Sequence, residues 1–102
     1  MNCGLPEATI TQIRGVLARF AEVDKAVLYG SRAMGNYRTG SDIDLTLYGA
    51  GLSFDLLGLI ANELDDLLLP YTIDLSIFEQ LSHAELREHI ERVGKAFYER
   101  KT

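Results

Sequence analysis

Residues 27–48 have the sequence VLYGSRAMGNYRTGSDIDLTLY, in which two apolar runs flank a polar stretch that contains three glycines. The first run, residues 26–29, predicts a strand that ends at Gly30. In the second run, residues 43–48, isoleucine and leucine alternate with more polar residues. This period of two predicts a strand with one face in the core. Between the strands, residues 31–41 predict a short helix or tight turn followed by a polar loop.

Apolar residues at helical spacing predict a helix on each side of these two strands. The first runs from near Pro6 to about Phe20, since proline suits a first helical turn and apolar residues recur along one face. The second follows Ser53, a residue type that favours the N-cap, and extends to about Leu69. Pro70 stops this helix.

The last third of the chain predicts one more strand and one more helix. Residues 72–78 alternate apolar and polar side chains and predict the third strand. Ser82 and Glu85 have the spacing of a capping box, which predicts the start of a helix. An apolar stripe at helical spacing extends from there to Phe97, so we expect a helix over residues 82–97.

The order of the predicted elements, α-β-α-β-α-β-α, favours an α/β (α+β) layer architecture. We expect a small mixed three-stranded sheet flanked by about four helices, in a single domain over residues 1–102. A chain of 102 residues supports one modest core and no second one. With 47% hydrophobic and 25% charged residues, the composition is close to the globular average and excludes disordered and fibrous classes.

The charge balance and the single cysteine limit the compartment and the partners. Fifteen acidic against ten basic residues leave a net charge of −5. Because nucleic acids and anionic membranes bind basic surfaces, we expect neither as a direct partner. Cys3 cannot form an internal disulfide, and no apolar stretch approaches the length of a membrane span. The first residues lack the layout of a signal peptide, so we expect a cytoplasmic protein.

Gly30 and Ser31 form a candidate phosphate-binding turn directly after the first strand. A residue without a side chain permits close approach of a ligand. The free amides of the next turn and the Ser31 hydroxyl can donate hydrogen bonds to phosphate. The alternative is an ordinary turn that ends a strand.

Three aspartates form a candidate metal site. Asp42 and Asp44 are two residues apart at the start of the second strand, so their carboxylates share a face. Asp74 is the only charged residue in the third strand and joins them if the two strands are neighbours. Oxygen ligands suit Mg²⁺, and three carboxylates around two metal ions suit in-line displacement at phosphorus. The alternatives are a solvated strand end for the pair and an ion pair with an arginine for Asp74.

Together these motifs resemble the minimal nucleotidyltransferases of the DNA polymerase beta superfamily. The family pattern is Gly-Ser, then Asp-x-Asp after an intervening loop, and a third Asp on a later strand. Gly30-Ser31, Asp42-Ile43-Asp44 and Asp74 match it in order. The order of elements also matches the palm-like core of that family, so the resemblance covers most of the chain.

The resemblance implies which residues bind the nucleotide. Gly30 and Ser31 would hold its terminal phosphates, and Arg32 and Ser41 match further positions of the motif. For Arg32, a surface salt bridge is the alternative to a phosphate contact. Members often read Gly-Ser-Arg-Ala-Arg-Gly, whereas Met34 takes the place of the second arginine here.

The resemblance also implies the catalytic set. Asp42 and Asp44 would bind Mg²⁺, two ions in all, and Asp74 would complete the metal site. Asp74 would in addition help to deprotonate the attacking hydroxyl. The implied reaction moves NMP from an NTP, AMP from ATP above all, onto a hydroxyl.

Stand-alone minimal members of the family are typically antitoxins that adenylylate a tyrosine on a small helical RNase toxin of the HEPN type. The resemblance therefore implies ATP, or another NTP, as substrate and such a toxin as partner, and it leaves a homo-oligomer open. Two other functions are open at this point. One is a non-catalytic antitoxin that neutralises its partner by stoichiometric binding. The other is nucleotidyl transfer to a small-molecule hydroxyl of the aminoglycoside kind.

Neither histidine predicts a metal site. His83 and His89 have no second histidine, cysteine or carboxylate at ligand spacing. We therefore expect both histidines at the surface.

The helix that follows Ser53 has a wider apolar surface than a single core stripe needs. The surplus residues include Leu56, Leu59 and Leu68. They predict either an interface with another protein or a deep position in the core.

Overall fold

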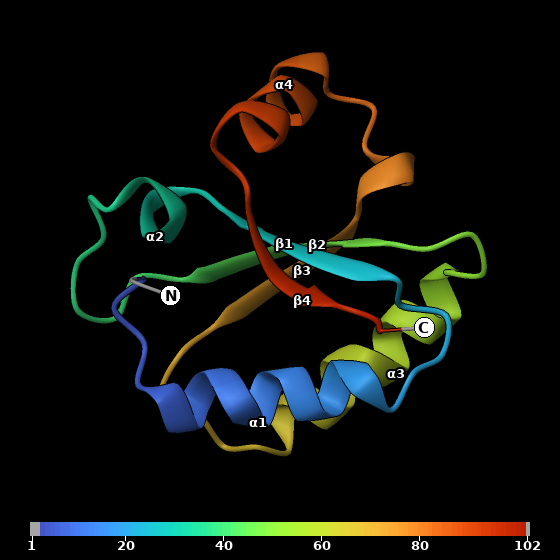
Figure 1. The fold of residues 1–102 in the computed structure, drawn as a ribbon, viewed down its shortest axis with the longest axis horizontal. Coiled ribbons are helices and arrows are strands. Elements are labelled where there is room, and N and C mark those ends of the chain that lie inside the picture. Colours follow the sequence, from blue (N-terminus) through green and yellow to red (C-terminus); the bar gives the residue numbers. More distant parts are fainter. Residues whose placement is uncertain (1–2, 102) are drawn as a thin grey trace.

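The computed structural model describes residues 3–101, which form a mixed four-stranded sheet with helices against both faces (Figure 1). The elements are α1 (Glu7–Ala18), β1 (Lys25–Tyr29), α2 (Ser31–Met34), β2 (Ile43–Tyr48), α3 (Phe54–Asp65), β3 (Ile73–Ile77), the 3₁₀ turn η1 (Phe78–Gln80), α4 (Ala84–Val93) and β4 (Lys95–Glu99). The predicted α/β class is confirmed, and the strand count is four rather than three.

The strands lie in the order β3-β2-β1-β4 across the sheet. β1 is antiparallel to both of its neighbours, whereas β2 and β3 are parallel. Parallel neighbours need a crossover connection, and α3 provides it. As a result, the end of β1 and the beginnings of β2 and β3 meet at the same edge of the sheet.

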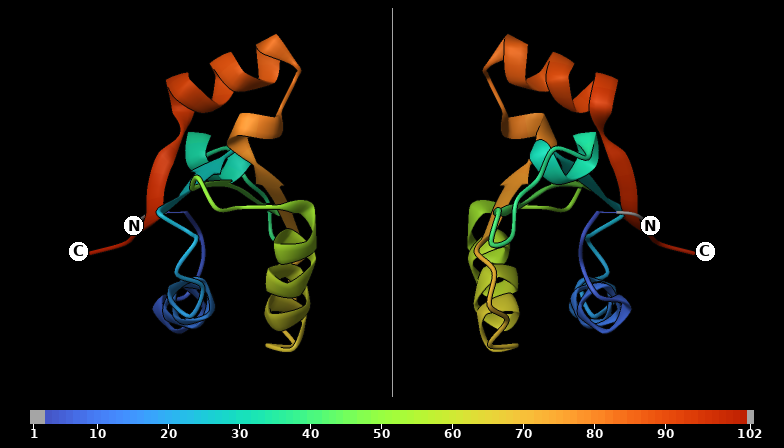
Figure 2. Two further views of the ribbon diagram at one scale, coloured as in Figure 1. Left: turned by 90° about the vertical axis from the view of Figure 1, so that its right-hand side faces the viewer. Right: turned by 90° about the vertical axis from the view of Figure 1, so that its left-hand side faces the viewer.

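Helices cover the two faces of the sheet unequally. α1 and α3 lie next to each other against one face, and α4 crosses the other (Figures 1 and 2). The main core lies between the sheet and the α1–α3 layer, where Ile43, Leu45 and Leu47 of β2 are fully buried. This burial confirms the predicted alternation, and it leaves the residues between them to face α4.

The predicted final helix over residues 82–97 is wrong in its last turn, because residues 95–99 form the edge strand β4. α4 ends at Val93, and Gly94 is extended with φ −60° and ψ 143°. A Cβ atom at Gly94 would overlap the carbonyl oxygen of Ile90, so a glycine is needed where the chain turns from α4 into the sheet. Phe97 is 1% exposed and enters the main core from β4. An apolar residue at this position fits a helix and a strand equally well. The structure favours the strand, because β4 pairs with the side of β1 that β2 leaves free.

Other helix ends differ from the predictions by a few residues. α4 is capped by His83, whose Nδ1 accepts a hydrogen bond from the Leu86 amide at 3.2 Å, so the predicted capping box at Ser82 is wrong. α3 ends at Asp65, four residues before the predicted Leu69. None of the helices within residues 3–101 is long and apolar enough to cross a lipid bilayer.

The surplus apolar residues after Ser53 do not lie deep in the core. Leu59 and Leu68 are 57% and 87% exposed, and Leu56 is half-buried. The deep-core alternative is therefore wrong. Phe54, at the start of α3, is also exposed.

Candidate active site

Two of the three predicted aspartates lie in register on neighbouring strands. Asp44 of β2 pairs with Asp74 of β3, and Tyr29, the last residue of β1, pairs with Asp44. Paired residues on neighbouring strands point to the same face. Tyr29 packs in a cluster with Ile90 of α4, so this row of side chains faces α4 and not the main core.

The third aspartate, Asp42, precedes β2 and is exposed. Burial raises the pKa of the Asp44 carboxyl above its ordinary value of 3.8, and the charges of Asp74 and Asp42 raise it further. The charge of the nearby His89 acts in the opposite direction when its imidazole is protonated. The Asp44 carboxylate thus lies close enough to those of Asp74 and Asp42 to be repelled by both.

Gly30 lies directly against the Asp44 carboxylate. Its backbone has φ 74° and ψ −156°, a conformation that side chains disfavour. A Cβ atom on Gly30 would overlap Asp44 Oδ2. The Gly30 carbonyl accepts hydrogen bonds from the amides of Ala33 and Met34 at 3.2 and 3.1 Å, which starts the short helix α2. The predicted turn at Gly30-Ser31 therefore forms. It packs against Asp44, which together with Asp74 makes up what we call the aspartate row.

Arg32 and Ser41 hold the loop that leads into Asp42. Arg32 is only 2% exposed, and its Nε and Nη2 donate to the Ser41 carbonyl at 3.1 and 2.9 Å. Its Nη1 donates to the Cys3 carbonyl at 3.0 Å. Ser41 Oγ accepts a hydrogen bond from the Arg38 amide at 2.8 Å. The surface salt bridge considered for Arg32 does not form, since its partners are backbone carbonyls; a phosphate contact by Arg32 or Ser41 stays a prediction.

His89 belongs to this site, although the sequence predicted an ordinary surface residue. Its Nε2 accepts a hydrogen bond from the Gly30 amide at 3.3 Å, and its ring lies edge-on to Tyr29 with 6.2 Å between centroids. One signal was available in the sequence. His89 is three residues after Leu86 and four before Val93, which places it beside the apolar stripe of α4.

The family of the chain follows from a comparison of its sequence with models of known families. The model described as polymerase beta, nucleotidyltransferase, matches residues 11–102. The chain belongs to this nucleotidyltransferase family. No curated protein is similar enough in sequence to match it.

Solved structures share the fold of this nucleotidyltransferase domain. A chain of a toxin–antitoxin structure with AMP-PNP superposes with a TM-score of 0.70 at 22% identity, over 95% of this chain and 76% of that chain. A chain of the toxin–antitoxin MntA-HepT has a TM-score of 0.69 at 20% identity, over 93% and 74%. A chain from the complex of the tri-AMPylated Shewanella oneidensis HEPN toxin with its MNT antitoxin has a TM-score of 0.69 at 20% identity, over 92% and 72%. At these low sequence identities, the structural similarity shows that this chain shares their fold.

The aspartate row of the nucleotidyltransferase domain suits a divalent cation. Among residues 3–101, no group of three or more histidine, cysteine, aspartate or glutamate side chains is arranged as a complete metal site. Mg²⁺ does not need one, because it binds one or two carboxylates and fills its other positions with water and phosphate oxygens. The repulsion of the Asp44 carboxylate by Asp74 and Asp42 is the property that such a cation would relieve.

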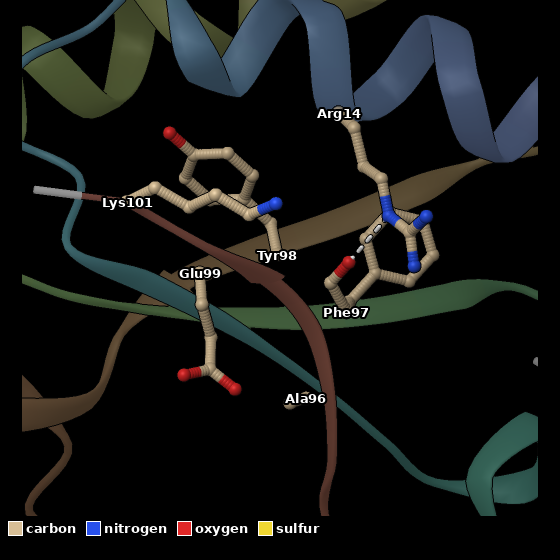
Figure 3. A pocket seen from close by; sticks show the side chains of 6 residues that line it. All are labelled: Arg14, Ala96, Phe97, Tyr98, Glu99 and Lys101. Atoms are coloured by element: carbon tan, nitrogen blue, oxygen red, sulfur yellow. Dashed lines mark hydrogen bonds between the residues drawn. The ribbon is translucent and has the colours of Figure 1, made fainter.

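The cavity in Figure 3 is separate from the aspartate row of the nucleotidyltransferase domain. It has a volume of about 330 Å³ and lies where the outer edge of β4 passes α1. Arg14 Nε donates to the Phe97 carbonyl at 2.7 Å, which satisfies one backbone group of the edge strand (Figure 3). Neither Gly30 nor any of the three aspartates lines this cavity. The candidate active site is therefore the surface at the strand ends beneath α4.

Proposed function

We propose that this chain is an Mg²⁺-dependent nucleotidyltransferase that transfers AMP from ATP onto a hydroxyl of a partner protein. We propose as partner a small helical toxin of the HEPN type, which would make the chain its antitoxin. The family match supports the reaction class. The relatives of the same fold, which include toxin–antitoxin complexes, one of them with AMP-PNP and one with an AMPylated toxin, support the partner.

One observation carries the assignment of the site: Asp44 and Asp74 lie in register, and Gly30 packs against Asp44 without a side chain between them. This juxtaposition would bring phosphates bound at the turn next to the carboxylates. We assign the binding of two Mg²⁺ ions to the aspartates Asp42, Asp44 and Asp74. When bound there, Mg²⁺ supplies positive charge that stabilises the charge developing on the transferred phosphoryl group.

The residues of the chain itself bind the phosphates and accept the proton. The Ser31 amide and the Ser31 hydroxyl would hold the terminal phosphates and orient the α-phosphorus, while the Gly30 amide stays bonded to His89. The acceptor oxygen forms a bond to this phosphorus while the bond to the oxygen that bridges the α- and β-phosphates breaks. The acceptor proton goes to the Asp74 carboxylate, and pyrophosphate leaves. Asp74 is exposed, so an acceptor from outside the chain can reach it.

We also propose that residues 1–102 act as one nucleotidyltransferase domain in the cytoplasm. The elements share one sheet, which supports a single domain. ATP is available in the cytoplasm, and the buried Cys3 is a free thiol, as a reducing compartment favours.

The test uses ATP labelled either at the α- or at the γ-phosphate. The purified protein, Mg²⁺ and a lysate of the cells that encode it are incubated with each substrate. We expect the purified protein to add α-label, and no γ-label, to one discrete protein band relative to the lysate alone. The variant with Asp42→Asn and Asp44→Asn is the control and should transfer no label.

Three results would contradict all or part of the proposal. Transfer of the γ-label that occurs only when the purified protein is added would identify a kinase. No transfer at all, at protein concentrations that still capture a partner, would favour an antitoxin that acts by binding alone. Label that moves to a small molecule would keep the reaction and replace the protein acceptor.

A further inference from the structure

α4 is held firmly against the face of the sheet that carries the aspartates. Ile90 is 1% exposed and packs with Val27, Tyr29 and Phe78. At one end of the helix, Arg87 Nη1 donates to the carbonyls of Phe78 and Leu81 at 2.8 and 2.9 Å. At the other end, Gly94 has no room for a side chain, because a Cβ atom there would also lie 2.6 Å from Val27 Cγ1. Residues of α4 therefore have a defined place over the sheet.

This placement of α4 brings His89 into contact with Gly30. Its Nε2 accepts the Gly30 amide hydrogen bond at 3.3 Å, and the imidazole forms a T-shaped contact with the ring of Tyr29, the residue before Gly30. Asp44 fills the space where Gly30 would otherwise carry a side chain. The Gly30 peptide is thus fixed from two elements, α4 and β2.

A glycine at φ 74° has many conformations open to it, so its own chain does not fix the direction of the next amide. The hydrogen bond to His89 fixes the peptide before Gly30, and the hydrogen bonds from the Ala33 and Met34 amides to the Gly30 carbonyl fix the peptide after it, so together they restrict this freedom. Small displacements of a group that orients a substrate cost large factors in rate or affinity. The orientation of the Gly30-Ser31 turn therefore depends on a residue that is 59 positions away in the sequence.

We propose that His89 is a positioning residue, which holds the Gly30-Ser31 turn in the conformation that binds the nucleotide phosphates. This inference rests on the proposed function, since it concerns the same site. His89 needs an acceptor atom at the place of Nε2, and it acts through Gly30 rather than on the substrate.

Two variants separate the hydrogen bond from the shape of the side chain. His89→Gln keeps an acceptor oxygen at a similar reach, and His89→Phe keeps a planar ring against Tyr29 but has no acceptor. Glu88→Gln, an exposed neighbour on the same helix, is the control. The readouts are the amide NMR shift of Gly30, the affinity for α,β-methylene ATP with Mg²⁺, and the KM and kcat of AMP transfer.

We expect His89→Phe to weaken the affinity for the analogue and to raise the KM for ATP about tenfold, as the loss of one hydrogen bond does. The kcat should fall by a smaller factor. The Gly30 amide should shift in His89→Phe and stay near its wild-type position in His89→Gln and Glu88→Gln. His89→Gln should recover most of the affinity.

Equal affinity in His89→Phe and the wild type would overturn the inference, and so would equal losses in His89→Phe and His89→Gln. Either result leaves the proposed function intact as long as the wild type binds the analogue and transfers AMP. A wild-type protein that binds no analogue would overturn the proposed function, and this inference with it. In each case the NMR spectra establish that the variants are folded.

Discussion

At Gly30, the absence of a side chain lets the backbone touch the Asp44 carboxylate. Gly30→Ala would force an alanine into φ 74° and overlap Asp44 Oδ2, so we expect a loss of about 1–3 kcal/mol in the free energy of unfolding. The affinity for nucleotide should fall as well. Urea denaturation and nucleotide titration measure the two effects.

Gly35→Ala is the matched control for this substitution. Gly35 also has a positive φ of 84°, but nothing lies within 4 Å of its Cβ position. It should lose less stability than Gly30→Ala and keep its nucleotide affinity. Equal effects of the two substitutions would show that contact with Asp44 is not what requires a glycine at position 30.

The Asp44 carboxyl should make the stability depend on pH. Burial and the charges of Asp74 and Asp42 raise its pKa above 3.8 in the folded protein, so the folded state holds this proton more tightly than the unfolded state. Stability from this group is therefore full below pH 3.8 and is lost as the pH rises through the folded pKa. We expect Asp44→Asn to be more stable than the wild type at pH 7 without Mg²⁺, and this difference to vanish below pH 3.8.

Urea denaturation at the two pH values checks this prediction, with Asp24→Asn in an exposed loop as the control. A gain of the same size at both pH values would contradict it, because the gain would then not come from the charge of Asp44.

Single residues were predictable where a local pattern fixed them. Strand alternation predicted a common face for Asp44 and Asp74 on the condition that their strands are neighbours, which the pairing of β2 with β3 meets. The residue type at Gly30 predicted the close approach of a ligand, and the structure shows the Asp44 carboxylate in contact there. The buried position of Arg32 and the contact of His89 with Gly30 were not predictable. Both depend on segments far away in the sequence, Cys3 for Arg32 and α4 for His89.

At the scale of elements, periodicity predicted β2 with its observed bounds and misread the end of the chain. The residues of β4 continue the apolar stripe of α4, so a pattern at helical spacing includes Phe97. What decides between helix and strand is tertiary: Gly94 packs against Ile90, and β1 has an open edge. A single sequence does not show either fact.

Two glycines inside helices should reduce stability without a structural need. Gly15 in α1 and Gly58 in α3 have nothing within 4 Å of their Cβ positions. Because glycine disfavours a helix interior, we expect Gly15→Ala and Gly58→Ala to stabilise the protein by about 0.5–1 kcal/mol each. Urea denaturation measures this change, with Gly94→Ala as the contrasting variant that should destabilise. A loss of stability in either helix variant would mean that the glycine has a role the packing does not reveal.

For the whole molecule, the family and the fold agree with what the motifs implied. Gly-Ser, Asp-x-Asp and a later aspartate are far apart in the sequence, and the sheet brings them to one edge. The motif identified the family because its parts occur in a fixed order, which is visible in a single chain. The partner does not follow from the fold in the same way, because the exposed apolar residues Leu59 and Leu68 could contact partners of many kinds.

The central claim is that the three aspartates and the Gly30-Ser31 turn bind a nucleotide together with Mg²⁺. Calorimetric titration with α,β-methylene ATP tests it most directly, because it needs neither the partner nor a reaction. We expect the wild type to bind the analogue with Mg²⁺ and not without it, and the variant with Asp42→Asn and Asp44→Asn not to bind in either case. Equal binding with and without Mg²⁺, or full binding by the variant, would contradict the account.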